Sequence, residues 1–427
     1  MDFSPSPRAQ QWQARLSAFM ARYLLPYNAA WHASVQEGVF PPPFMADLKT
    51  LAQEEGLWNL FLPTLQPDEP GTALSHLDYA PLAETMGRLP WAAEVFNCNA
   101  PDSGNMALLQ QFANGAQRAQ WLLPLLRGEI RSAFAMSEPD VASSDPTNLQ
   151  TSVREEGDAL VLQGRKWFIT GAAHPDCRLL IVMARNHDAP ADAHHSHSLV
   201  LVPMDTPGVE VVRNIPVVHH LAPDGHCEIV LRQVRLPRTS LLGPWGEGFA
   251  MAQARLGPGR VHHCMRTIGQ CELALELASE RTLERQMHGR VLAEQSNVQD
   301  WLAESRIEID QARLLVLHTA WLLDQGGELS HEARAKIAAI KVVAARLQSR
   351  VVERAMQIFG AMGLSPDTPL AYFWTWGRAM HLMDGPDEVH LRTVARLEIA
   401  RARERMGQSA AWFTTPEQML AEPHVEA

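Results

Sequence analysis

Asp384 is the residue whose type and position best suit acid–base chemistry, because it stands just before a predicted helix start in the segment Asp384–His390. Pro386 suits the first helical position, since its missing N–H would have no partner there. Asp387 and Glu388 then fall in the first turn, where the helix dipole favours negative charge. Asp384 lies outside that turn on a glycine-containing corner. It is therefore either a helix N-cap or a carboxylate that points into a cleft as a general base.

The elements that must position this carboxylate fall into three blocks, and a chain of 427 residues is too long for one compact core. Residues 8 to about 127 have a helical pattern. Residues 131 to about 240 contain short β-rich runs between Gly, Pro and Asp, which is typical of a sandwich or barrel: Leu179–Met183, Ser198–Val202 and Glu228–Leu231.

The pattern is helical again from about residue 247. Neither Gly nor Pro occurs between Gly289 and Gly326, or from His331 to Phe359, which favours long antiparallel helices. We therefore predict a mostly α protein with a central β domain. Its predicted parts are an N-terminal helical domain (1–130), a middle β domain (131–244), a C-terminal four-helix bundle (245–410) and a C-terminal tail (411–427).

Composition excludes several classes of protein. A net charge of −11 argues against a nucleic-acid partner, which needs a basic face. No run approaches 18 apolar residues, so we expect no membrane span. The N-terminus does not resemble a signal or transit peptide, and the C-terminus is not a peroxisomal address. The five cysteines form no C-x-x-C pair, which suggests reduced thiols and a cytoplasmic protein: Cys98, Cys177, Cys227, Cys264 and Cys271.

Two groups of histidines raise the possibility of a metal site: His262 with His263, and the group His194, His195 and His197. The second group lies in an Ala/Asp/Ser tract that is typical of a solvated turn. No Cys or carboxylate has ligand spacing with His262. We therefore expect no metal.

Five segments follow one another in a fixed order: Ala133–Pro139 with Ser143–Asp145, Gly164–Gly171, Arg285–Gly289, Gln357–Gly363, and Met383–Pro386 with Val394–Arg396. Together they resemble motifs of the acyl-CoA dehydrogenases, over about residues 10 to 405. In that family the first residue of an E-G-T type corner is the catalytic base. Here Asp384 stands in place of Glu and Pro386 in place of Thr.

The segment Arg255–Arg266, together with the corner, is most similar to one subgroup of that family. In eukaryotes the subgroup includes dehydrogenases fused to a kinase-like domain, and a kinase-like part is absent from this chain. The resemblance implies the acyl-CoA dehydrogenase fold, with FAD as cofactor and an acyl-CoA as substrate.

The resemblance also implies which residues contact the flavin ring: Phe134, Met136, Ser137, Trp167, Phe168 and Thr170. Ser137 would contact the pyrimidine end and Thr170 the hydride-accepting nitrogen. The family usually has Trp just before Ile-Thr, whereas here Phe168 takes that position and Trp167 comes one residue earlier. From the residues alone, ordinary strand packing is the better explanation of both segments.

A second set of residues is implied to hold the phosphates and adenosine of FAD: Arg285, His288, Gln295, Gln357, Gly360 and Gly363. In the family these contacts are made to the FAD of a neighbouring subunit, so the resemblance implies a homodimer or homotetramer. Arg285 is explained equally well as a surface charge in a last helical turn. Gly360 and Gly363 would each mark a helix C-terminus or a close backbone approach.

The substrate side is implied to include Arg260, which matches a CoA-side arginine in the first turn of the first bundle helix, together with Met383 and Gly385. Ser143 and Ser144 match the contact to the thioester or CoA arm, and the sequence does not choose between them. The stretch Thr375–Arg378 departs from the family's R-D-x-R element, with only Arg378 matching.

The implied reaction is α,β-dehydrogenation to a trans-2-enoyl-CoA, with Asp384 as base and FAD as hydride acceptor. Gly259 occupies the other position from which family members take a base, so Asp384 is the only candidate. We expect Leu382, Met383, Trp374 and Trp376 to raise the basicity of the carboxylate by apolar burial once substrate expels water.

Two alternatives stay open. One is a flavoenzyme of the same fold that acts on a 4-hydroxy- or 4-phospho-acyl-CoA, with a separate kinase as partner. The other is a non-catalytic flavoprotein that binds acyl-CoA. The acyl chain is not specified by the sequence, and the family expectation for the electron acceptor is an electron-transfer flavoprotein.

Overall fold

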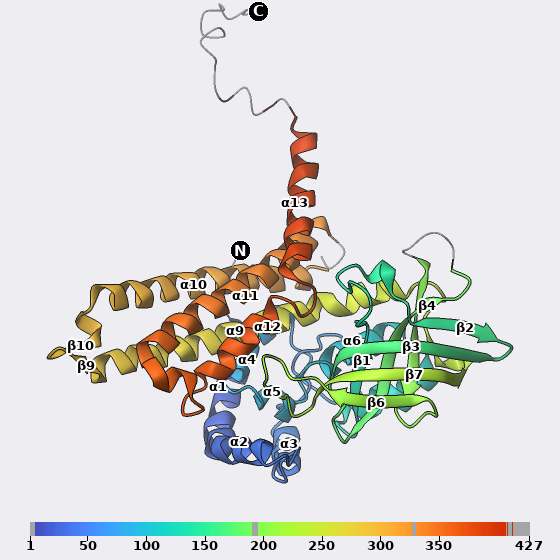
Figure 1. The fold of residues 1–427 in the computed structure, drawn as a ribbon, viewed down its shortest axis with the longest axis horizontal. Helices are drawn as coiled ribbons and strands as arrows, with labels where there is room; N and C mark the ends of the chain where they lie inside the picture. Colours follow the sequence, from blue (N-terminus) through green and yellow to red (C-terminus); the bar gives the residue numbers. More distant parts are fainter. Residues whose placement is uncertain (1–4, 190–194, 327–329, 407, 409–411, 413–427) are drawn as a thin grey trace, which may run out of the picture.

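The structure is a computed structural model that describes residues 5–189, 195–326, 330–406, 408 and 412. Short helices, a twisted sheet and a set of long helices follow one another along the chain, and the sheet lies at one end of the long helices (Figure 1). This arrangement confirms the predicted fold class, a mostly α protein with a central β region.

The N-terminal block consists of short helices packed against the start of the long-helix block. Ser6 and Ser75 cap two of them by accepting hydrogen bonds from Ala9 and Asp78 N–H, which would otherwise lack a partner. The α-helices of this block are α1 Pro7–Phe19, α2 Asn28–Gln36, α3 Met45–Glu54, α4 His76–Gly87, α5 Ala92–Val95, α6 Asp102–Phe112, α7 Gly115–Gln117 and α8 Leu123–Leu126.

The sheet has the strand order β6-β7-β3-β2-β4-β5-β8 in the described residues, and β1 also pairs with β4. The pairs β1–β4 and β2–β4 are parallel and the others are antiparallel. The strands are β1 Arg131–Ala135, β2 Ser152–Glu156, β3 Ala159–Thr170, β4 Cys177–Asn186, β5 His197–Pro203, β6 Val209–Asn214, β7 His226–Pro237 and β8 Leu241–Leu242.

Strand β4 reads as a continuous apolar run because both of its faces are covered. Alternate side chains of a strand point to opposite faces. Leu179 and Ile181 belong to the core shared with the helices, whereas Leu180 and Val182 belong to a second core on the other face. The sheet therefore separates two hydrophobic cores.

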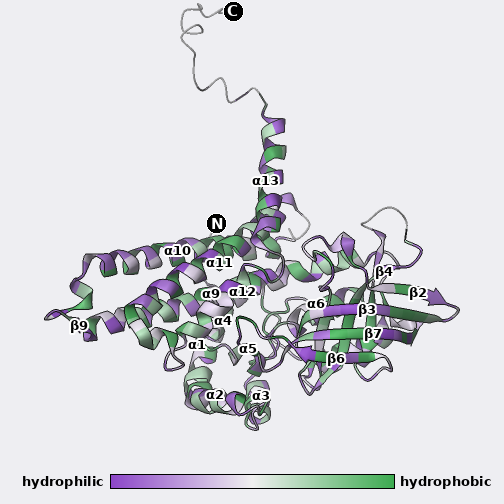
Figure 2. Cartoon of the chain, viewed as in Figure 1, coloured by the Kyte–Doolittle hydropathy of each residue, from purple (hydrophilic) through white to green (hydrophobic). Residues whose placement is uncertain are grey.

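The long-helix block is formed by α9 Gly248–Glu284, α10 Ser296–Asp324, α11 His331–Phe359, α12 Leu370–Met380 and α13 Asp387–Glu404. A small hairpin, β9 Gln286–Met287 and β10 Arg290–Val291, joins α9 to α10. The prediction of a long helix from His331 to Phe359 is confirmed. Figure 2 shows hydrophilic and hydrophobic residues mixed along these helices.

Helix α13 extends away from the rest of the chain (Figure 1), and only Asp387 and His390 in it are buried. Asp387 and Glu388 occupy its first turn, as the sequence predicts. Pro386 is the N-cap and not the first helical residue, so that prediction was wrong by one position. Among the described helices, none combines the length and the apolar character that crossing a bilayer requires. All five cysteines are unpaired and buried.

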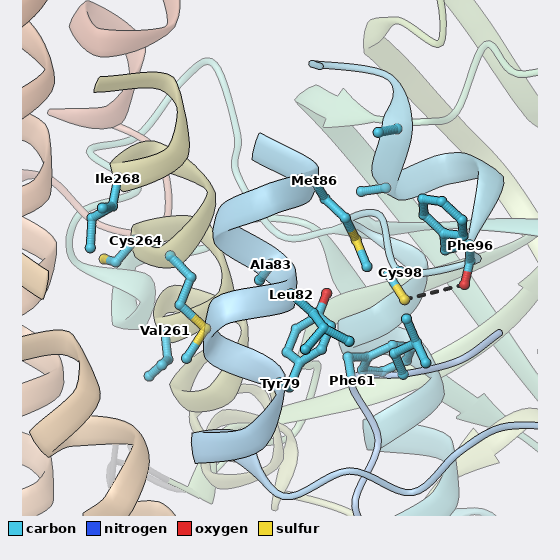
Figure 3. Close-up of a cluster of buried hydrophobic side chains, with 14 of the residues drawn as sticks. Phe61, Tyr79, Leu82, Ala83, Met86, Phe96, Cys98, Val261, Cys264 and Ile268 are labelled. Carbon is cyan, nitrogen blue, oxygen red and sulfur yellow. Dashed lines mark hydrogen bonds between the residues drawn. The ribbon is translucent and has the colours of Figure 1, made fainter. Parts of the chain in front are cut away.

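Helices α4 and α9 cross at two glycines. A methyl group on Gly87 would overlap the Arg266 carbonyl oxygen, and one on Gly269 would overlap the Glu84 carbonyl oxygen. Figure 3 shows Tyr79, Leu82 and Met86 of α4 in the buried cluster beside α9. The backbones therefore approach closely because neither glycine has a side chain. This contact fixes the position of the Arg266 backbone relative to α4.

Gly269→Ala is expected to destabilise the protein by about 1–3 kcal/mol, because a close-packed crossing cannot admit the extra methyl group. Gly259→Ala is a matched control on the same helix, where the new Cβ would meet no atom within 4 Å. That control should stabilise α9 by about 1 kcal/mol through helix propensity. Thermal unfolding of both variants measures the difference, and similar melting temperatures would contradict the prediction.

Arg131 links the helices to the sheet through a buried ion-pair network. From the start of β1 it pairs with Asp102 of α6, and its Nη1 lies 2.8 Å from Glu94 Oε1 of α5. Lys49 Nζ also lies 2.9 Å from Glu94 Oε1. Asp102 accepts further hydrogen bonds from the N–H and hydroxyl of Ser132. The carboxylates at this junction are therefore both paired and hydrogen-bonded.

Candidate active site

Asp384 lies on a strained corner between α12 and α13. It has φ 54°, and Gly385 follows with φ 98°. Arg260 Nε donates a hydrogen bond to the Asp384 carbonyl oxygen at 3.0 Å, and His390 Nε2 donates to the same oxygen at 3.2 Å. Because α13 is capped by Pro386 without a side-chain hydrogen bond, Asp384 is not its N-cap. The strain is held in place by a helix on each side.

Four cationic or basic side chains face the Asp384 carboxylate: Arg255, Arg260 and His263 from α9 and Lys341 from α11. Burial alone would raise the pKa of this carboxyl, but His263, Arg260 and the other two groups lower it below its usual value. The carboxylate is therefore ionised at neutral pH. In the described residues no side chain hydrogen-bonds to it, and a quarter of the side chain, 25%, is exposed.

Arg255 connects this corner to the sheet. Its guanidinium carbon lies 4.2 Å from the centroid of the Phe134 ring of β1, and its Nε donates to Asn105 Oδ1 at 2.8 Å. Burial lowers the pKa of Arg255 to about 10. Lys341 is fully buried and donates to the Met380 carbonyl oxygen, and burial lowers the pKa of its ammonium too. Arg255 therefore stays charged at neutral pH with few anionic neighbours.

One expectation about this corner was wrong. Arg260 does not lie in a first helical turn, because α9 already begins at Gly248 and continues through Pro258. In the ligand-free protein the carboxylate does not lie in an apolar environment, since Leu382 is 60% exposed and the Trp374 indole donates to Glu353 Oε2 at 2.9 Å. The rise in basicity on substrate binding stays a prediction. Cations determine the pKa of Asp384 in the ligand-free protein, and they shift it in the opposite direction from apolar burial. Met383 is partly buried and does pack against the core.

The structure brings together the two segments matched to the flavin ring. The backbone N–H of Trp167 donates to the Ser137 carbonyl oxygen at 3.0 Å. The pairing of β3 with β7 shifts register between Lys166 and Ile169. In this shift Phe168 has φ 51° and its side chain is 42% exposed. An irregular strand therefore presents an exposed aromatic ring beside the Met136–Ser137 segment.

A buried ion pair holds the first of these segments. Lys166 Nζ donates to Glu138 Oε1 and to the Met136 carbonyl oxygen, each at 2.8 Å. Glu138 also accepts the N–H groups of Gln150 and Thr151. Burial lowers the pKa of Lys166 to about 8. The ammonium therefore ties the end of β1 to β3.

Thr170 lies at the end of β3, where its Oγ1 is 3.0 Å from His226 Nδ1. The rings of His226 and Trp376 of α12 are 5.5 Å apart, edge to face. Within the described residues, His226 Nε2 and Trp376 Nε1 are buried without a hydrogen-bond partner. Buried polar atoms are usually satisfied, so two such atoms beside Thr170 indicate a place where a bound group can supply partners.

The two candidate serines have different surroundings. Ser143 Oγ accepts the Glu138 N–H at 2.9 Å and donates to the Glu138 carbonyl oxygen at 3.2 Å, whereas Ser144 is exposed. Ser143 therefore stabilises the loop after β1. Of the two hydroxyls, that of Ser144 is the more accessible.

The second predicted group lies at the far end of the long helices. Arg285 is the C-cap of α9, His288 lies in the β9–β10 hairpin with φ 51°, and Gln295 is the N-cap of α10. Gln357 and Gly360 lie at the C-terminal end of α11. The C-terminal ends of α9 and α11 are in contact through Arg281 and Phe359, with the Arg281 guanidinium carbon 5.5 Å from the Phe359 ring centroid. In Figure 1 this hairpin and the sheet lie at opposite ends of the folded molecule.

Both predicted glycine explanations are confirmed at the end of α11. Gly360 is the C-cap with φ 64°, a conformation that suits glycine. Gly363 has no positive φ, but a methyl group there would lie 2.8 Å from the Met356 carbonyl oxygen. One glycine therefore ends the helix and the other allows a close approach.

The histidines considered for a metal site are dispersed. His197 is buried in β5 and not in a solvated turn, which corrects that expectation, and His194 lies outside the described residues. His262 is buried against Phe61 and Tyr79. Among the described residues no three His, Cys, Asp or Glu side chains are arranged to hold a metal ion.

Sequence reasoning missed three basic residues around Asp384, namely Arg255, His263 and Lys341, and also Arg266, which contacts His263. The spacing of Arg260, His263 and Arg266 gave a usable signal, because residues three apart on a helix are neighbours. Lys341 gave no such signal, since nothing in the sequence marks one lysine of a long helix as buried.

Models of three domains match consecutive parts of the chain. They are described as the N-terminal, middle and C-terminal domains of acyl-CoA dehydrogenase, and match residues 6–129, 133–234 and 246–399. A relative in Mycobacterium tuberculosis, probable acyl-CoA dehydrogenase FadE2, is 50% identical over 408 residues, which cover 94% of this chain and 98% of the relative.

Human acyl-CoA dehydrogenase family member 11 is 42% identical over 412 residues, which cover 95% of this chain. The chain spans about half of that relative, 52% of its length. A solved structure of a putative acyl-CoA dehydrogenase from Mycobacterium abscessus is 46% identical with a TM-score of 0.89, covering 93% of this chain and 99% of that one. The FAD complex of PigA shares the fold at 22% identity, with a TM-score of 0.82, covering 94% and 100%.

Proposed function

Because this chain belongs to the acyl-CoA dehydrogenase family, we propose that it oxidises an acyl-CoA thioester to the trans-2-enoyl-CoA with FAD. The observation that carries the proposal is the ionised Asp384 carboxylate, held on a strained corner and linked through Arg255 to Phe134 of the sheet. An ionised carboxylate at that corner can accept a proton from the α carbon of a bound thioester.

The residues of the sheet fit a flavin. The exposed Phe168 ring supplies a stacking face, and the unpartnered Nε2 of His226 beside Thr170 supplies a polar edge. Met136, Ser137 and Thr170 would line the ring. FAD, when bound, supplies the hydride acceptor.

Each step of the reaction assigns a task to the chain. Asp384 takes the α proton, and the C–H electron pair moves toward the thioester carbonyl as an enolate forms. In the described residues the Asp384 backbone N–H donates no hydrogen bond, so it is available to the developing oxygen charge. As the α,β double bond forms, the β hydrogen leaves as hydride. Arg260 and Ser144 are proposed to bind the CoA side, and Met383 and Gly385 to contact the acyl part.

Arg285, His288, Gln295, Gln357, Gly360 and Gly363 are proposed to hold the adenosine and phosphate half of FAD in a neighbouring subunit. The support is their position at the end of the long helices opposite the flavin-side residues (Figure 1). A homodimer or homotetramer would then complete each site. The electron acceptor is proposed to be an electron-transfer flavoprotein.

A second candidate substrate is a 4-hydroxy- or 4-phospho-acyl-CoA, as in the subgroup with the kinase-like fusion. One observation favours it. Arg255 hydrogen-bonds only to the neutral groups Asn105 Oδ1 and Pro101 O in the described residues, although it is partly buried and charged. A polar or anionic substituent on the acyl chain would compensate this charge.

We expect the purified protein to be yellow, and its flavin absorbance to bleach on anaerobic mixing with an acyl-CoA. A panel of straight-chain, 4-hydroxy and 4-phospho acyl-CoAs separates the candidates, because the substrate should bleach the flavin fastest. A protein that binds FAD and acyl-CoA without bleaching is the non-catalytic alternative. Failure to take up FAD on reconstitution would exclude all three readings.

A further inference from the structure

His263 lies between the Asp384 carboxylate and the Arg266 guanidinium. Its Nε2 is 3.5 Å from Asp384 Oδ2, and its Nδ1 is 3.2 Å from Arg266 Nη2. His263 and Arg266 are three residues apart on α9, so their side chains are neighbours on one side of the helix. The three side chains therefore form a row that leads from the corner toward α4.

This row determines where the imidazole carries its proton. A guanidinium only donates hydrogen bonds, so His263 Nδ1 must accept the one from Arg266. Burial, followed by the charge of Arg266, lowers the pKa of His263 to about 4. The ring is therefore neutral at pH 7, and its single N–H is on Nε2, which faces Asp384. The Nε2–Oδ2 separation is slightly long, as catalytic contacts often are without substrate.

The far end of the row is anchored to rigid backbone. Arg266 Nη1 donates to the Cys98 carbonyl oxygen at 3.3 Å. The Arg266 backbone is itself packed against Gly87 of α4, where no larger side chain fits. Because both contacts are to main chain, Arg266 cannot move without displacing α4 or the segment that carries Cys98.

We propose that His263, oriented by Arg266, is a positioning residue for the catalytic base: its Nε2–H holds one oxygen of the Asp384 carboxylate and leaves the other for the substrate. This inference rests on the proposed function, in which Asp384 is the base. It gives this chain a means to fix an aspartate where relatives of the resembled family have the longer glutamate.

The same geometry argues against a proton relay. To take a proton from Asp384, Nε2 would need a free lone pair, but that nitrogen already carries the ring's proton. Moving the proton to Nδ1 would require Arg266 to give up its hydrogen bond, and a guanidinium cannot accept one. His263 therefore orients the carboxylate and stabilises its charged form.

Other charged groups act on the same pair and set the pH dependence. Arg255, Arg260 and Arg266 approach from α9, Lys341 from α11 and His390 from α13. Asp387 of α13 pairs with His381 at 2.7 Å. Arg255, Arg260 and Lys341 lower the pKa of Asp384 in any His263 variant, so removing His263 should raise this pKa only in part.

The test uses two amides of different length in the FAD-loaded protein. The Gln side chain can place its N–H donor near the position of histidine Nε2, whereas the shorter Asn side chain can place its Oδ1 acceptor near the position of Nδ1. His263→Gln should therefore keep the donor to Asp384, whereas His263→Asn should keep only the contact with Arg266. We expect His263→Asn to lower kcat for flavin reduction by about 10- to 100-fold, and His263→Gln to stay within about fivefold of the parent. KM should change little in either.

The pH profile provides a readout that a purely structural role would not change. Loss of the N–H donor should raise the pKa of Asp384, so the acid limb of kcat/KM moves to higher pH in His263→Asn and not in His263→Gln. If His263→Asn does not retain FAD, His263→Ala replaces it with a good helix former and should give the same slow rate and shifted limb.

Equal rates and profiles for the Asn and Gln variants would overturn the inference, as would a slow His263→Gln enzyme with normal FAD content. Asp384→Asn is measured beside them. If that variant still bleaches at the parent rate, the proposed base fails and this inference fails with it. A slow Asp384→Asn enzyme with an unaffected His263→Asn enzyme overturns only the role of His263.

Discussion

Asp384→Asn should reduce the rate of flavin bleaching by an acyl-CoA by about 10²- to 10⁴-fold, the usual contribution of a positioned general base. The amide keeps the size of the side chain but has almost no basicity. The Arg260 and His390 hydrogen bonds to residue 384 should persist, because both go to its main-chain carbonyl. FAD content and acyl-CoA binding are therefore expected to stay close to those of the parent. Stopped-flow absorbance under anaerobic conditions measures the rate.

Glu388→Gln is the matched control, since Glu388 is an exposed carboxylate in the first turn of α13, four residues away. It should bleach at the parent rate. The pH dependence has a definite sign as well. Because His263, Arg260 and Lys341 outweigh burial and lower the pKa of Asp384, the acid limb of kcat/KM should lie below the ordinary aspartate value of 3.8. An acid limb near pH 6 would mean that another group limits the reaction.

The sequence predicted those parts of the fold that depend on local pattern. The absence of Gly and Pro from His331 to Phe359 predicted a helix with those bounds, because helix formation is local and each breaker would have interrupted it. The apolar run Leu179–Met183 predicted a buried strand for a similar reason. Motif order placed Ser137 near Trp167, and a backbone hydrogen bond joins them.

What the sequence did not predict depends on tertiary contacts. The first-turn assignment of Arg260 came from the family resemblance and failed because α9 already begins at Gly248 and passes through Pro258. The basic surroundings of Asp384 were not predicted, because they come from side chains of α9 and α11 that precede Asp384 by more than 40 residues along the chain. Lys341 in particular is buried by packing that no local pattern records.

Arg131→Met should destabilise the protein by about 3–5 kcal/mol, because it leaves two buried carboxylates without their guanidinium. Asp102 is 1% exposed and Arg131 is 4% exposed, so water cannot replace the lost partner. Burial would raise the pKa of Glu94, but Arg131 and Lys49 lower it well below its ordinary 4.5. The stabilisation is thus fully present above about pH 4.5 and is lost as pH falls further, so the variant and the parent should converge in acid.

Arg235→Met makes the same substitution in an exposed pair, where Arg235 Nη1 lies 2.7 Å from Glu156 and the side chains are 59% and 40% exposed. It should cost less than about 1 kcal/mol. Urea unfolding followed by tryptophan fluorescence compares the two variants. Adding Asp102→Asn to Arg131→Met should recover part of the lost stability, because most of the destabilisation in the single variant comes from the unpaired charge of Asp102 and less from the missing contact. Full additivity of the two substitutions would show instead that Arg131 and Asp102 stabilise the junction independently.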